Sequence, residues 1–79
     1  MIRHIITFAN LHQVLSAEKA LRLAPDKDFP VRPTSTPPGL DEAVCGMSIE
    51  VLDGLRLEEV LEYLNKQALP PRGVHQVDA

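Results

Sequence analysis

The sequence is poor in the residues that usually mark a specific chemistry. It has no tryptophan, one cysteine, and three aromatic residues, Phe8, Phe29 and Tyr63, so aliphatic side chains must fill most of the core. One cysteine cannot form an internal disulfide. No apolar run approaches the roughly 20 residues that span a bilayer, and no signal-peptide pattern opens the chain. These features predict a protein with no membrane segment in a reducing, cytoplasmic setting.

Clustered positive charge is also missing. Eight Lys and Arg residues are scattered among 11 Asp and Glu residues, which gives a net charge of -3 and a pI near 5.5. A protein that binds nucleic acid needs a basic patch for the phosphate backbone, so we expect no nucleic-acid partner. The four glycines stand apart from one another, which excludes a glycine-rich phosphate loop.

The length of 79 residues and the apolar fraction of 44% indicate one small folded domain, residues 1–79. Hydrophobic periodicity and breaker residues predict, in order, a strand over 1–9, a helix over 10–24, strands over 29–34 and 45–51, and a helix over 54–69. Residues 34–44 are expected to be a long loop, and residues 70–79 a tail that frays or adds a short strand over 73–77.

This order of elements predicts an α+β fold. A β-α-β-β-α chain with an optional last strand matches the ferredoxin-like split βαβ, in which two helices cover one face of a mainly antiparallel sheet. Pro30 and Pro33 cannot donate to a strand ladder, so the strand over 29–34 belongs at a sheet edge. Asn10 is positioned to cap the first helix and Asp53 the second.

Side-chain patterns predict which residues face the core. In the strand over 45–51, Met47 and its alternate neighbours form the apolar face, while Ser48 and Glu50 form the polar outer face. The first helix shows an apolar stripe of Leu11, Val14, Leu15, Ala17, Ala20, Leu21 and Ala24. The second helix shows a stripe of Leu57, Val60, Leu61, Leu64 and Ala68.

The cysteine, Cys45, lies between the proline-rich loop and a strand. A thiolate is the nucleophilic form of cysteine, so reactivity requires exposure and a lowered pKa. Gly46 and the preceding loop favour an accessible sulfur, whereas Asp41 and Glu42 would disfavour a thiolate nearby. Free cysteine is also among the most buried residue types. Both a reactive and a packing role therefore remain open.

Other catalytic or metal-binding patterns are absent from the sequence. His4, His12 and His75 show no spacing typical of a zinc site, so we expect neither metal nor cofactor. Glu58, Glu59 and Glu62 are best interpreted as a solvated helix face. Nothing supplies a partner set for a Cys/His nucleophile. Whether the protein is an enzyme stays open, with a non-enzymatic role favoured.

Two motifs resemble those of a known family. The run Thr36-Pro37-Pro38 followed by Cys45-Gly46 is similar to the T-P-x(n)-C-G pattern of the selenium/sulfur carrier-like family. The run Ile6-Thr7-Phe8 and the triplet Ala17-Glu18-Lys19 look like that family's opening strand and first helix. The resemblance covers most of residues 2 to 66.

The resemblance implies a role for the cysteine. Cys45, framed by Thr36, Pro37 and Gly46, would carry sulfur or selenium as a persulfide-type adduct between a donor protein and an acceptor protein. Family members often have Arg after the Thr-Pro pair, where this chain has Pro38.

A second hypothesis belongs to a different class of protein. The chain would be a structural or protein-interaction module, with homo-oligomers among the options, and Cys45 would only fill space. In that case an exposed sheet edge or face, with Ile5 or Val31 as apolar surface, would recruit the partner.

Overall fold

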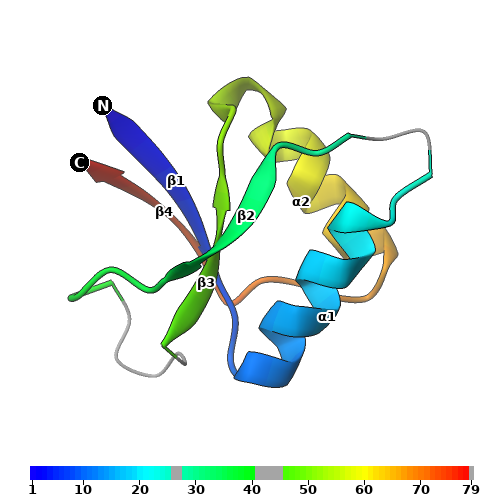
Figure 1. Ribbon diagram of the computed structural model, residues 1–79, viewed down its shortest axis with the longest axis horizontal. Coiled ribbons are helices and arrows are strands. Elements are labelled where there is room, and N and C mark those ends of the chain that lie inside the picture. The colour runs from blue at the N-terminus through cyan, green and yellow to red at the C-terminus, as the bar shows by residue number, and fades with distance from the viewer. Residues whose placement is uncertain (26–27, 41–45, 79) are drawn as a thin grey trace.

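The fold places two helices on one face of a four-stranded sheet (Figure 1). The computed structural model describes residues 1–25, 28–40 and 46–78. The elements in chain order are β1 (Ile2–Thr7), α1 (Leu11–Arg22), β2 (Val31–Ser35), β3 (Met47–Val51), the 3-10 turn η1 (Gly54–Arg56), α2 (Leu57–Lys66) and β4 (Gly73–Asp78). This confirms the predicted α+β class and the optional last strand. In the described ranges no helix has the length and apolar character needed to cross a membrane.

The sheet has the order β2-β3-β1-β4, and each neighbouring pair is antiparallel. β3 therefore lies between β1 and β2, the two strands that α1 connects, as the split βαβ prediction requires. β2 is an edge strand, which agrees with its Pro33. β2 continues to Ser35, so it includes two residues of the segment expected to be a loop from residue 34.

The apolar core lies between the sheet and the two helices. Ile6 of β1 is paired with Ile49 of β3, and their side chains share the face that the helices cover. The fully or nearly fully buried members of this core are Ile6, Phe8, Val14, Ala17, Leu21, Ala24, Phe29, Ile49, Val51, Val60 and Leu64. As the composition predicted, the core is mostly aliphatic.

The start of α1 is fixed by a predicted cap. The side chain of Asn10 accepts a hydrogen bond of 2.9 Å from the backbone N–H of Gln13, and the side chain of Gln13 accepts one of 3.1 Å from Ala9 N–H. These bonds satisfy donors that a helix start leaves unpaired. Asp53 caps η1 through Leu55 N–H at 3.0 Å, and α2 begins after that turn.

The predicted helix stripes are partly wrong. Leu11 and Leu15 are 49% and 56% exposed, because the stripe that reaches the core is centred on Val14. Each helical residue turns by about 100° around the axis, which moves Leu15 to the side of the helix. Ala68 lies beyond the end of α2, is exposed and has a φ of 57°, so it does not extend the second stripe.

The opposite face of the sheet, which neither helix covers, is more buried than expected. We call it the open face. Ser48 and Glu50 were predicted to face outward into solvent, but both are buried. Ile5, suggested above as apolar surface for a partner, has no exposed area, and Val31 is half-buried against the core. Neither residue supplies the exposed apolar surface that the interaction hypothesis assumed.

Candidate functional site

The two ends of the segment that joins β2 to β3 are held together by hydrogen bonds. The backbone N–H of Thr36 donates to Gly46 O at 2.9 Å, and the hydroxyl oxygens of Thr36 and Ser48 are 2.5 Å apart. We call this pair of contacts the clamp. Gly46 is exposed and Pro37, next to Thr36, is half-buried. Two of the three predicted framing residues therefore meet directly, while Cys45 lies outside the described residues.

Ser48 is the member of the clamp that sequence reasoning missed. Alternation assigned it correctly to the face opposite Met47, but gave no sign that its hydroxyl would be buried against Thr36. The register of the β2–β3 pair explains this contact. Ser48 pairs with Thr34, and Thr36, two residues after Thr34, lies on the same face of the sheet. A prediction of the hairpin register would have been the signal needed to find it.

Ser48→Ala is expected to destabilise the protein by about 1 kcal/mol, because it removes one buried hydrogen bond. Ser35→Ala, in the same hairpin but at an exposed position, is the matched control and should change stability by less than about 0.5 kcal/mol. Urea unfolding of both variants measures the difference. Equal values for the two variants would show that the clamp contributes nothing to stability.

A charged cluster lies on the open face, along the same hairpin. Arg32 pairs with Glu50 across the β2–β3 ladder, and Glu50 is next to Ile5 across the β3–β1 ladder. Arg3 donates from Nε to Glu50 Oε2 at 3.1 Å and from Nη2 to Oε1 at 3.0 Å. Arg32 donates from Nε and Nη2 to Oε1 at 3.3 and 3.1 Å. One carboxylate thus holds two guanidinium groups.

The electrostatics of this cluster follow from its hydrogen bonds. The bonds from Arg3, and then those from Arg32, hold the pKa of the Glu50 carboxyl below its ordinary value of 4.5, although burial acts in the opposite direction. Arg3 Nη2 also donates to the hydroxyl of Thr34 at 3.3 Å. Glu50 therefore remains ionised at neutral pH and connects β1, β2 and β3 on the open face.

One protein family matches almost the whole chain. The family described as "Putative Se/S carrier protein-like" matches residues 3–76, which include most of β1 and β4 and everything between them. The chain belongs to this family. The resemblance to this family noted in the sequence is therefore confirmed. No curated protein and no solved structure matches the chain.

The histidines of this Se/S carrier-like protein form no metal site in the described part of the chain. No three His, Asp or Glu side chains gather there in a way that could hold a metal ion. His12 is exposed on α1. His75 is half-buried in β4, and its Nε2 is buried without a hydrogen-bond partner among the described residues. Nδ1 of His4 is buried in the same way.

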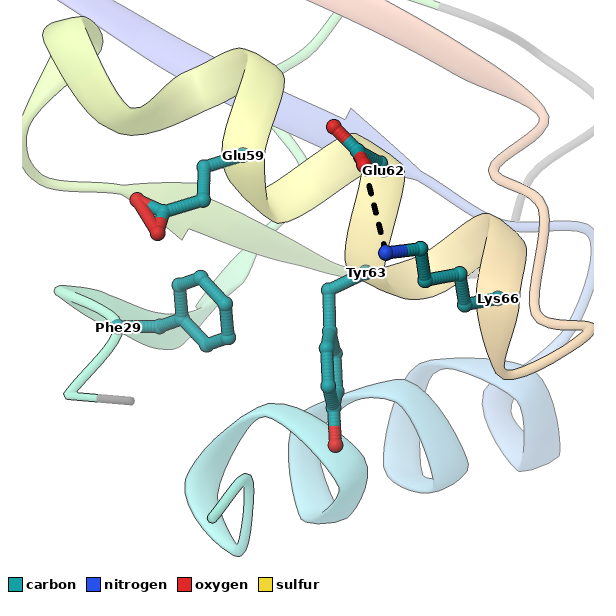
Figure 2. Close-up of a pocket in the computed structure, with 5 residues that line it drawn as sticks. All are labelled: Phe29, Glu59, Glu62, Tyr63 and Lys66. Carbon is teal, nitrogen blue, oxygen red and sulfur yellow. Dashed lines mark ion pairs between the residues drawn. The ribbon is translucent and has the colours of Figure 1, made fainter. Parts of the chain in front are cut away.

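A shallow cleft lies between α2 and the residues before β2 (Figure 2). Its volume is about 150 Å³, and the rings of Phe29 and Tyr63 meet in it with centroids 5.3 Å apart. At its rim, Glu62 pairs with Lys66 at 3.4 Å and Glu59 pairs with Arg56 at 3.0 Å. The charges are thus paired within the protein, and the volume is below the several hundred Å³ of typical ligand pockets.

The cleft and the clamp are on different sides of the molecule. Residues 36–40 leave the sheet on the side away from the helices, whereas the cleft is bordered by α2 (Figure 1). The cleft shares no lining residue with the clamp.

Proposed function

We propose that this protein is a carrier in which the thiol of Cys45 accepts sulfur or selenium from a donor protein and passes it to an acceptor protein. The family assignment carries the proposal, since the family name describes a Se/S carrier-like protein and Cys45 is the single thiol in the sequence. The exposure of Gly46, the next residue, supports access to the sulfur. Thr36, Pro37 and Gly46 frame the site.

The proposed transfer needs no oxidant. The thiolate of Cys45 attacks the outer sulfur of a persulfide on the donor, forming a new S–S bond while the S–S bond of the donor breaks. The donor leaves as a thiolate, and Cys45 becomes the persulfide. In delivery, a thiolate of the acceptor attacks the outer sulfur of the Cys45 persulfide, and Cys45 leaves as a thiolate. Such exchanges depend on the thiolate fraction of the attacking group and on its access.

The clamp supports a surface role for the thiol. It holds Thr36 against Gly46 and Ser48, so the described residues on either side of Cys45 have a fixed position at the end of the β2–β3 hairpin. A carrier needs an accessible sulfur and a surface for partners rather than a deep pocket. We infer that residues 1–79 act as one domain in the cytoplasm, where thiols stay reduced.

The direct test is mass spectrometry after incubation with a cysteine desulfurase and cysteine. We expect the mass of wild-type protein to increase by one sulfur atom, and dithiothreitol to remove the addition. A known carrier protein serves as the positive control. If that control is loaded while this protein is not, the sulfur-carrier proposal fails; the selenium form is tested in the same way with a donor protein that already holds a perselenide, so that the exchange needs no oxidant.

One observation favours the second hypothesis, an interaction module. Leu11 and Leu15 are exposed and lie four residues apart on α1, so they form a small apolar surface. Thiol labelling separates the two hypotheses. A carrier thiol should react with a small maleimide at nearly the same rate in buffer and in denaturant. Labelling that becomes fast only in denaturant would identify Cys45 as a packing residue.

A further inference from the structure

The open face has a charge opposite to that of the protein as a whole. Among the strand residues that the structure places on this face, Arg3 and Arg32 are the cationic residues and Glu50 is the only acidic one. The face thus has a surplus of one positive charge, although the whole chain has a net charge of -3. A local reversal of sign attracts anions to one surface of an otherwise acidic protein.

The two guanidinium groups are held in place but are not saturated. Each uses Nε and Nη2 to bind Glu50, and neither Nη1 has a hydrogen bond to any residue that the structure describes. A guanidinium has five N–H donors in a planar fork, so the Nη1–Nη2 edge of Arg32 keeps free donors, whereas Arg3, whose Nη2 also donates to Thr34, keeps those of Nη1. The side chain of Arg32 is 59% exposed, which leaves that edge open to solvent.

We propose that the open face binds an oxyanion, with Arg32 as the main contact and Arg3 as the second. Glu50 acts as a positioning residue, because it fixes both guanidinium groups before the ligand arrives and limits the entropy lost on binding. The ligand is a phosphate or carboxylate group, since both match the fork of a guanidinium through paired hydrogen bonds. The site consists of Arg3, Arg32 and Glu50 and does not use the proposed carrier thiol.

The test is a titration of the folded protein with inorganic phosphate, followed by amide and arginine side-chain NMR shifts at constant ionic strength. A second titration with acetate distinguishes a phosphate-selective site from one that accepts any carboxylate. We expect saturable shifts at Arg3, Arg32 and Glu50 with at least one of the two anions. Chemical shifts that change linearly with the concentration of both anions, over the whole protein, would overturn the proposal. The cluster would then serve only to connect neighbouring strands.

Arg32→Gln and Arg22→Gln form a matched pair of variants. Both arginines are 59% exposed and each pairs with one glutamate, but Arg22 lies on α1. Arg32→Gln should weaken anion binding about tenfold or more, as expected for loss of a charged hydrogen-bond donor, while Arg22→Gln should leave it unchanged. Equal effects of the two variants would indicate non-specific attraction and overturn the proposal.

A third variant separates this proposal from the carrier function. Cys45→Ala removes the thiol and should leave phosphate or acetate binding unchanged. Loss of anion binding in that variant would contradict a separate site. Failure of sulfur loading in wild-type protein, in turn, has no bearing on the titration.

Discussion

A Cys45→Ala variant is expected to lose all sulfur loading while its free energy of unfolding stays within about 1 kcal/mol of wild type. The loss is complete because the sequence contains no second thiol that could accept the sulfur. The small change in stability is expected because β3 begins at Met47 and the neighbouring Gly46 is exposed. Mass spectrometry after desulfurase treatment measures the first quantity, and urea unfolding measures the second.

Two controls sharpen this expectation. Ser35→Ala, at an exposed position of the β2–β3 hairpin, should be loaded like wild type. Thr36→Val should still accept sulfur at Cys45, but the rate of sulfur loading should differ from that of wild type. The reason is that this substitution removes the hydroxyl of Thr36 that contacts Ser48 in the clamp. Destabilisation of Cys45→Ala by clearly more than 1 kcal/mol, as a cavity would cause, would support the packing role instead.

The fold was predictable because the local signals agree with one another. Asn10 makes the predicted cap of α1, whereas Asp53 caps the turn η1 that leads into α2 rather than α2 itself. Pro33 predicts an edge position for β2, and the sheet order places it there. Each of these signals depends on backbone chemistry within a few residues, which is the information that a sequence contains directly.

The open face was not predictable in the same way. Alternation places Ser48 and Glu50 on the face opposite the core, and in most antiparallel sheets such a face is solvated. Their burial depends on Arg3 and Thr36, which lie 47 and 12 residues away from Glu50 and Ser48, respectively. The pairing of strands across the sheet creates these contacts, and neither residue reveals its partner in the sequence.

The candidate site also has one part that the sequence reveals and one part that depends on contacts between distant residues. The Thr-Pro and Cys-Gly motifs were identified by resemblance, and the structure brings Thr36 and Gly46 together at 2.9 Å. Their contact with Ser48 required the hairpin register. The error on α1 has a different cause, since Leu11 and Leu15 fit an apolar stripe by composition but are turned away from the sheet. A broad stripe does not fix how a helix is rotated against its neighbours.

Glu50→Ala is expected to destabilise the protein by about 2–3 kcal/mol. Removing one partner of a buried ion pair typically costs 3–5 kcal/mol, and the value should be lower here because Arg32 can turn to solvent. Glu62→Ala is the matched control, since Glu62 is 71% exposed and pairs with Lys66, and it should cost less than about 1 kcal/mol. Urea unfolding at pH 7 compares the two variants.

The same carboxylate predicts how stability depends on pH. Because hydrogen bonds from Arg3 lower the pKa of folded Glu50 below 4.5, its contribution is fully present above the unfolded pKa and is lost as the pH falls through the folded pKa. The difference in unfolding free energy between wild type and Glu50→Gln should therefore be large at pH 7 and shrink below about pH 4.5. The other carboxylates titrate in both proteins, so their effect cancels in this difference. A difference that is the same at pH 7 and pH 3 would show that the charge of Glu50 does not hold the open face together, and Arg3 and Arg32 would then lack the fixed position that anion binding requires.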